Sequence, residues 1–518
     1  MFKVDVIDAQ RGFSDSLSSK GENKGESLSP LFTKYYDNHL NPADQPEKED
    51  VNALKAIDKA QTEFNLRLKH SLKDAINEIE KLGYPGFSDP QISLSTKLDP
   101  KDGLGHEAAV NFSMSGVDED AEVAFELPES LNGLGYKNLI YMIFKLISFR
   151  DDWMLKGKAR KRAKTFIEPL HLVFIEEPEA HLHAQVQQVF IRRAYEVLTK
   201  GVDKVFSSQL IVSSHSSYLA HEVEFEKLRY FRRSAAKCAN SVPTSDVVNL
   251  SSVFSIKDKG EEEKLTAKFV SRYIKTTHCD LFFANGIIMV EGAAERILLP
   301  HFIKSRYQDT LNNTYLSILE VGGAHAHRLR SLIETLKIPT LIITDADAVD
   351  ENGHKVQPKF DPSYKTGSDT LKSWFKFSDK NFKEILKLPF ESKVRRNVCA
   401  VYQYGIEVAE FDGKTAVPYT FEDALALSNI EQIKGLDSPT GMISKMKVAS
   451  SNESLIKCAE LMFDALKGDK AQMALDVLYD MNPSELNIPK YISEGLDWLA
   501  QTTSIASSDY SVEKKECK

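Results

Sequence analysis

The chain has 518 residues, 42% of them hydrophobic and 27% charged, a size and composition typical of two or three globular domains. Its formal net charge of -9 excludes a uniformly cationic nucleic-acid binder, so contact with nucleic acid would require local basic patches. Its five cysteines are scattered without a CxxC pair, which argues against a disulfide framework or a zinc ribbon. There is no apolar run long enough to span a bilayer and no signal-peptide core, so we expect a cytoplasmic protein without a membrane partner.

The N-terminal third of the chain predicts a helical arm followed by short strands. Residues 51–82 place apolar residues three and four apart with charges between them, and the pattern ends at Gly83 and Pro85, which indicates an amphipathic helix. From about 91 to 127, alternating runs such as ISLSTKL and AEVAFEL predict strands. The run KGKARKRAK at 156–164 is the densest basic stretch, compatible with phosphate contacts or with a solvated loop.

Two strand and helix patterns further along indicate two α/β units. Apolar runs at 171–175 (HLVFI) and 209–214 (QLIVSS) flank a helix-length stretch at 184–199, as in parallel strands that are covered on both faces. From Gly286 onward, the runs GIIMVE, LSILEV and TLIITDAD alternate with two helical stretches. We therefore predict an α/β fold with a domain boundary near residue 284.

This boundary divides the chain into three expected parts. The first domain covers residues 1–284, and a second domain with a parallel sheet covers residues 285–503. Residues 504–518 are expected to be a disordered tail. Within the second domain, the stretch 350–380 is rich in Lys, Asp, Ser and Gly and is expected to be a loop.

Acidic residues stand at the strand ends of the second domain. Glu291 ends the strand IIMV, Glu295 lies in the first turn of the next helix, and Asp345 and Asp347 follow the strand LIIT. Because functional groups gather at the carboxyl ends of parallel strands, we expect these four carboxylates to converge. Such oxygen ligands suit Mg2+ or Mn2+, and two ions of this kind support phosphodiester cleavage. Each acid taken alone is also explained as a helix cap or a solvated loop residue.

The same residues match a family pattern. VEGAAE after a strand, VGG at Val321–Gly323 and DAD after an apolar strand resemble the TOPRIM fold of topoisomerases, primases and nucleases. An alternative interprets IITDADAV as the DxD nucleophile loop of a haloacid-dehalogenase-like phosphatase. That loop normally follows the first strand and requires no upstream ExxxE, so the TOPRIM resemblance is the better match.

The first domain resembles an ABC-type ATPase. LVFIEEPEAHLH at 172–183 has the form of a Walker B strand, in which Glu176 would hold Mg2+ and Glu177 would polarise the attacking water. His215 follows the next strand, as the switch histidine does. PESLNGLGYKNLIYM at 128–142 resembles a degenerate ABC signature, which would offer backbone N–H groups to a phosphate. Its candidate cofactor-binding residues are Ser130, Asn132, Gly133 and Gly135.

An ABC-type ATPase followed by a TOPRIM domain resembles the overcoming lysogenization defect (OLD) nuclease family, which includes the Gabija nuclease and some retron effectors. The resemblance implies a DNA endonuclease or nickase of an anti-phage defence system, dependent on Mg2+ or Mn2+. It also implies a homodimer or larger assembly, with a helical dimerisation insertion at about 35–85, and it extends to VIDAQR at 6–11. Glu422 in YTFED would join the metal site, and Lys470 in KGDKAQMAL would stabilise the transition state.

One motif of an ATPase is missing from the sequence. GxxxxGK[ST], whose backbone N–H groups cradle nucleotide phosphates, occurs nowhere in the 518 residues. We therefore expect that the chain begins partway through the ATPase domain and hydrolyses little ATP alone. ATP would bind only if a missing segment or a partner protein supplied the P-loop. Truncation, a split gene and a degenerate ATPase would all give this sequence.

Two other functions stay open at this point. The first is a non-catalytic regulatory or assembly protein, for which clustered carboxylates would have no use. The second is a TOPRIM enzyme that acts on RNA.

Overall fold

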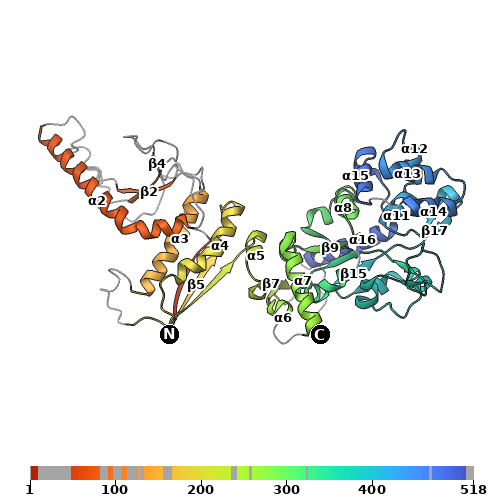
Figure 1. Ribbon diagram of the computed structural model, residues 1–518, viewed down its shortest axis with the longest axis horizontal. Helices are drawn as coiled ribbons and strands as arrows, with labels where there is room; N and C mark the ends of the chain where they lie inside the picture. The colour runs from red at the N-terminus through yellow and green to blue at the C-terminus, as the bar shows by residue number, and fades with distance from the viewer. Residues whose placement is uncertain are drawn as a thin grey trace. The chain divides into compact units, whose positions relative to one another are not determined.

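The computed structural model describes residues 2–9, 48–81, 91–96, 108–113, 126–128, 134–155, 166–234, 242–255, 260–322, 325–465 and 470–508. The chain divides into two compact units, Met1–Val223 and Glu224–Lys518, which Figure 1 shows in red to yellow and in green to blue. Residues 224–283 thus group with the second unit, whereas the sequence suggested a domain boundary near residue 284. Among the described residues, no helix is long and apolar enough to cross a membrane. The basic run at 156–164 lies outside the described residues.

The first unit is built on a three-stranded parallel sheet in the order β1-β5-β6. Its strands and covering helices are β1 (Phe2–Ile7), α3 (Leu134–Trp153), β5 (Leu170–Glu176), α4 (Ala184–Thr199), β6 (Ser207–Ser213) and α5 (Ser217–Glu222). The inward-facing side chains of α3 and α4 form one apolar core with Val173 and Ile175 of β5. The strands and the helix predicted between residues 171 and 214 are confirmed, with bounds that differ by at most two residues.

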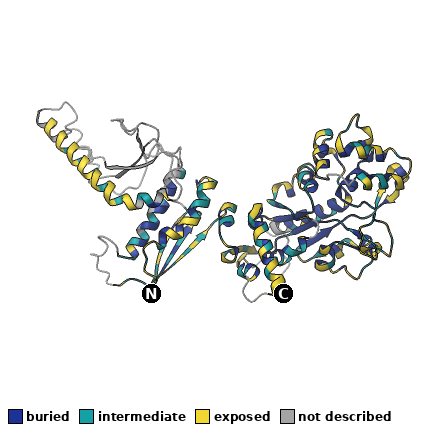
Figure 2. Ribbon diagram, viewed as in Figure 1, coloured by how far each residue is buried: buried dark blue, intermediate teal, exposed yellow. Residues whose placement is uncertain are grey.

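Helix α2 (Lys48–Glu80) is the helix that the periodicity of 51–82 predicts. Figure 2 shows that it is exposed along most of its length. Near its C-terminal end, the buried Glu78 forms ion pairs with Arg150, at 3.4 Å, and with Lys200. Arg150 also donates a hydrogen bond of 2.9 Å from Nη1 to the carbonyl oxygen of Val197. These contacts fix the end of α2 to α3 and α4.

The strands predicted between residues 91 and 127 form a small antiparallel sheet of order β2-β3-β4. They are β2 (Gln91–Thr96), β3 (Ala108–Ser113) and β4 (Glu126–Pro128). This sheet is separate from the parallel sheet of the first unit.

The second unit contains a five-stranded sheet of order β10-β9-β11-β15-β14, in which only β14 runs antiparallel. Its strands are β9 (Gly286–Val290), β10 (Leu316–Glu320), β11 (Thr340–Ile343), β14 (Val394–Arg395) and β15 (Val398–Val401). Every residue of β9, β11 and β15 is buried, which explains why these strands are continuous apolar runs without alternation. The predicted parallel sheet of the second domain is confirmed.

Helices cover this sheet, and a C-terminal helical group completes the core. The α-helices are α6 (Ser251–Phe254), α7 (Glu261–Thr277), α8 (Ala293–Arg306), α9 (Arg330–Leu336), α10 (Phe382–Leu386), α11 (Phe421–Ser428), α12 (Ile430–Gly435), α13 (Gly441–Ser450), α14 (Leu455–Ala465), α15 (Lys470–Asp480) and α16 (Lys490–Ser508). Two hairpins flank them, β7 (Arg229–Ser234) with β8 (Thr244–Asn249), and β16 (Ile406–Val408) with β17 (Lys414–Ala416). Short 3-10 helices are η4 (Phe225–Lys227), η5 (Cys279–Phe283), η6 (Leu311–Asn313), η7 (Ala326–Leu329), η9 (Phe390–Lys393), η10 (Ala409–Phe411) and η11 (Pro483–Glu485).

Helix α16 approaches the sheet closely because of one glycine. A Cβ atom on Gly495 would lie 2.7 Å from Cδ1 of Leu341 in β11 and 3.0 Å from Cγ1 of Val401 in β15. A side chain at this position would therefore force the helix away from the strands. The helix continues to Ser508, five residues into the stretch expected to be a tail, and residues 509–518 lie outside the described residues.

The stretch 350–380, which the sequence suggested to be a loop, contains regular elements. The strand β12 (Ala348–Val349) pairs with β13 (Lys365–Thr366), and a π-helix, η8 (Thr370–Trp374), follows. Leu371 and Trp374 are buried and anchor this segment. Most of the stretch is a loop, as predicted, but its abundant polar residues concealed these few apolar anchors and the short elements.

Candidate functional site

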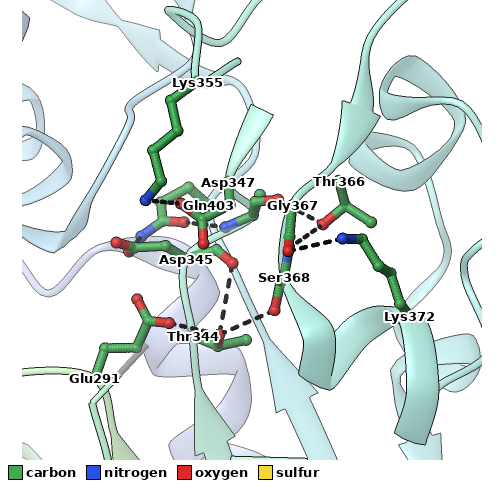
Figure 3. Close-up of polar contacts among 11 residues, drawn as sticks. Glu291, Thr344, Asp345, Asp347, Lys355, Thr366, Gly367, Ser368, Lys372 and Gln403 are labelled. Carbon is green, nitrogen blue, oxygen red and sulfur yellow. Dashed lines mark hydrogen bonds and ion pairs between the residues drawn. The ribbon is translucent and has the colours of Figure 1, made fainter. Parts of the chain in front are cut away.

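The carboxyl ends of three neighbouring strands bring polar side chains to one edge of the sheet in the second unit. Glu291 follows β9, Asp345 follows β11 after one residue, and Gln403 follows β15 after one residue. Because these strands are adjacent and parallel, their carboxyl ends lie side by side. Figure 3 shows Glu291, Asp345 and Gln403 gathered there around Thr344.

Glu291 and Asp345 form the centre of this site. The hydroxyl of Thr344 donates a hydrogen bond of 3.1 Å to Oε1 of Glu291, and the carboxyl groups of Glu291 and Asp345 affect the pKa of one another. Burial raises the pKa of Glu291, and the charge of Asp347 raises it further. Burial, followed by the charges of Glu291 and Glu295, raises the pKa of Asp345 well above its usual range. Both groups therefore bind a proton more readily than an exposed carboxyl group does when no cation is present.

A second pair of acids, one on α8 and one on α11, lies beside this centre. Glu295, in the first turn of α8, is 5% exposed, and burial together with the charge of Glu422 raises its pKa to about 8. Glu422 lies in the first turn of α11, where it accepts a hydrogen bond of 2.6 Å from the hydroxyl of Thr420. The predicted residue Glu422 thus lies close to Glu295, although the two are far apart in sequence.

Asp347 lies at the rim of the site. Its backbone has a φ of 48°, a left-handed conformation that is uncommon outside glycine. Its carboxylate is 17% exposed and forms an ion pair of 3.1 Å with the ammonium group of Lys355. Lys355 was not among the residues that the sequence singled out.

Gln403 is a further residue that sequence reasoning missed. It is 1% exposed, donates a hydrogen bond of 2.5 Å from Nε2 to Oδ1 of Asp345, and accepts one of 3.0 Å at Oε1 from the backbone N–H of Ala346. Its Nε2 also lies 3.5 Å from the hydroxyl of Tyr491 in α16. Gln403 therefore fixes the direction in which the carboxylate of Asp345 points. The sequence pointed to it only weakly, because its side chain is neutral and the strand before it, β15, has only four residues.

The donor chemistry of the site fits a divalent cation. Carboxylate oxygens are the ligands that Mg2+ and Mn2+ prefer, and a bound cation would offset the burial and the mutual repulsion that raise the pKa values of Glu291, Glu295 and Asp345. In the part of the chain that the structure describes, no group of three His, Cys, Asp or Glu side chains is arranged to hold a metal ion.

The remaining predicted residue of this site is Lys470. It is the first residue of α15, and its side chain lies outside what the structure describes. Its suggested contact with a reacting phosphate stays a prediction.

In the first unit, the predicted nucleotide-site residues meet at the carboxyl ends of β5 and β6. Glu177 has a φ of 42°, and its backbone N–H donates to the carbonyl oxygen of Ser213 at 2.9 Å. Its carboxylate Oε1 lies 3.5 Å from Nε2 of His215. Glu176 ends β5 and accepts a hydrogen bond of 3.4 Å from the backbone N–H of Ala9, just past β1. Glu176, Glu177 and His215 are therefore neighbours, as the sequence suggested.

The candidate signature segment is only partly described. Ser130, Asn132 and Gly133 lie outside the described residues, whereas Gly135 lies in the first turn of α3. A Cβ atom on Gly135 would lie 2.5 Å from the carbonyl oxygen of His181, so the glycine permits close packing of α3 on the loop after β5. This packing provides a structural reason for the glycine, independent of phosphate binding.

Comparisons with known proteins match both units. A family model described as an AAA ATPase domain matches residues 1–220, and one described as the TOPRIM domain of overcoming lysogenization defect protein-like proteins matches residues 282–347. Endonuclease GajA of Bacillus cereus (strain HuB5-5) is 29% identical over 401 residues, which are 74% of this chain and 55% of that protein. The OLD nuclease of Thermus scotoductus (strain ATCC 700910 / SA-01) is 27% identical over 182 residues, 35% of this chain and 31% of that protein.

The solved structures that align with the chain include one of an OLD protein. The C-terminal region of the Burkholderia pseudomallei OLD protein is 20% identical and covers 43% of this chain and 99% of its own, with a TM-score of 0.25. The chain spans about half the length of the first curated relative and a smaller share of the second.

Proposed function

Because the chain belongs to the overcoming lysogenization defect family, with an AAA ATPase domain and an OLD-like TOPRIM domain, we propose that it is a divalent-metal-dependent DNA endonuclease or nickase. The observation that carries this proposal is the group of carboxylates at the strand ends of the second unit. Glu291, Glu295, Asp345 and Asp347 all fall within residues 282–347, the stretch that matches the TOPRIM model. The names of the two relatives, endonuclease and nuclease, support the same reaction class.

The proposed roles follow from the contacts of each residue. Glu291, Glu295, Asp345, Asp347 and Glu422 would supply oxygen ligands to Mg2+ or Mn2+, with two ions as the expected number. When bound, such a cation polarises the scissile phosphate and makes the attacking water more acidic. Thr344 and Gln403 orient the carboxylates of Glu291 and Asp345, and Lys470 would offset the negative charge that develops on the phosphate.

Plasmid nicking tests this proposal. We expect the wild-type protein to convert supercoiled plasmid to the open circle with Mg2+ or Mn2+ and to lose this activity in a chelator. Glu291→Ala should abolish nicking, whereas Glu334→Ala should not, because Glu334 forms its ion pair with Arg330 on α9, outside the proposed ligand set. Equal nicking by the wild type and Glu291→Ala would overturn the proposed site.

We also propose that the nuclease acts in anti-phage defence, as a homodimer or larger assembly under the control of its ATPase domain. Support comes from the family resemblance and from the long helix α2, which is exposed along most of its length. A partner protein of the same defence system is compatible with this role.

The chain alone is expected to hydrolyse ATP negligibly. Glu176, Glu177 and His215 are neighbours, but no GxxxxGK[ST] sequence occurs in the 518 residues to hold the β- and γ-phosphates. Phosphate release should therefore stay at the background rate with or without DNA. ATP hydrolysis by the wild type that Glu177→Gln abolishes would show this expectation to be wrong.

A further inference from the structure

We infer that Lys355 is a substrate-binding residue that contacts a DNA phosphate beside the carboxylate cluster. The inference rests on the proposed endonuclease function and names a contact with the DNA backbone. Lys355 forms an ion pair of 3.1 Å with Asp347, yet its side chain is 69% exposed. Figure 3 shows the nitrogen of Lys355 pointing toward Asp347, and most of the side chain is open to solvent.

A short turn holds Lys355 in this position. The carboxylate of Asp350 accepts hydrogen bonds from the backbone N–H groups of Asn352 and His354, at 2.9 and 2.8 Å. Beyond the turn, Lys355 forms a β-bridge with Val349. These backbone contacts return the chain to the rim of the site, so the position of Lys355 does not depend on its ion pair alone.

The negative charge of the carboxylates explains why a nearby cation would favour DNA binding. Five carboxylates in one place repel a DNA phosphate, so each nearby cation lowers the energy of bringing the backbone to the site. Among the described residues, the pair of Lys355 and Asp347 is the one ion pair that joins a cation to any of the five proposed ligands. A lysine ammonium group is charged at neutral pH, so Lys355 can serve as this cation.

If a divalent cation binds Asp347, it competes with Lys355 for the same carboxylate. The released ammonium group, on a flexible four-carbon side chain, then lies next to the site where a phosphate would bind. The ion pair would thus exchange one anionic partner, a carboxylate, for another, a phosphate oxygen. No other chemical step is required of Lys355.

The salt dependence of DNA binding tests this inference. A short labelled duplex is titrated with protein in Ca2+, a cation with the same preference for oxygen ligands, across a series of salt concentrations, and gels verify that it stays intact. Lys355→Ala should weaken binding several-fold and reduce the slope of log affinity against log salt by about 0.9, the change for one phosphate contact. Lys355→Arg should retain the wild-type slope. Lys359→Ala, which removes an exposed lysine four residues further on, is the matched control and should also retain it.

Steady-state nicking and Mn2+ calorimetry separate a DNA contact from a purely structural role. A DNA contact predicts that Lys355→Ala raises KM with little change in kcat and does not weaken Mn2+ binding. A wild-type salt slope in Lys355→Ala, or a loss of Mn2+ affinity in that variant, would overturn the inference while the wild type still nicks DNA. If the wild-type protein fails to nick DNA with any divalent metal, the proposed function is contradicted, and the inference with it.

Discussion

Replacing Asp345 with Asn is expected to lower the rate of plasmid nicking at least about 100-fold, the effect of removing one strong electrostatic contact from a transition state. Asp345 lies between Glu291 and Gln403, so an amide at this position keeps the shape of the side chain but removes an anionic oxygen. The same change should stabilise the metal-free protein, because it removes one of the buried carboxylates that repel one another. Single-turnover nicking and thermal unfolding in a chelator measure the two effects.

A matched control for Asp345→Asn is Asp476→Asn. Asp476 is also buried, but it accepts hydrogen bonds from the backbone N–H of Met442 and from Gln472, far from the strand ends in sequence. This control should retain nicking and should not raise the unfolding temperature. A fully active Asp345→Asn protein would exclude Asp345 from the reaction, whatever its effect on stability.

Without divalent metal, the protein is expected to lose stability as the pH rises from about 4.5 toward 8. The pKa of Glu295 is about 8 in the folded protein against an ordinary value of 4.5, so the folded state binds this proton more tightly than the unfolded state does. The resulting stabilisation is complete below the ordinary pKa and is lost as the pH rises through the folded value. Its size is on the order of a few kcal/mol. Glu291 and Asp345 shift in the same direction and add to the trend.

Thermal unfolding midpoints measured across this pH range test the prediction. In a chelator, the midpoint should fall with rising pH, and Glu295→Gln should flatten the curve because an amide does not titrate. Saturating Mg2+ should raise the midpoint most at the upper end of the range, where the carboxylates are charged and bind the ion best. Midpoints that rise with pH in the chelator, or that Glu295→Gln leaves unchanged, contradict it.

The parallel sheets were predictable because their strands are continuous apolar runs. GIIMV and TLII are buried throughout, and such runs followed by acids locate Glu291 and Asp345 without knowledge of the fold. Helix α4 was predictable as a helix-length stretch between two such strands. Both signals come from residues that are near one another in sequence.

The contacts that complete the site were not predictable in this way. Gln403 reaches Asp345 from a different strand, and Lys355 reaches Asp347 after a turn inside a stretch that composition marked as a loop. The approach of Glu422 to Glu295 depends on how α11 packs near α8, and the sequence supplied it only through a family resemblance. A neutral amide, a lone lysine and a helix-capping acid carry no periodic signal, so tertiary structure was needed to relate them to the cluster.

Because of Gly495, the site is completed only after the C-terminal helix α16 has been synthesised. At this glycine, α16 packs closely on β11 and β15, and the helix places Tyr491 within 3.5 Å of Gln403, which orients Asp345. On the ribosome, the strands that bear Glu291 and Asp345 emerge roughly 150 to 200 residues before this helix, at a synthesis rate of about 5–20 residues per second. For about ten seconds or more, a nascent chain therefore holds the acids without the helix that aligns them, and the site is completed only when the last described helix docks.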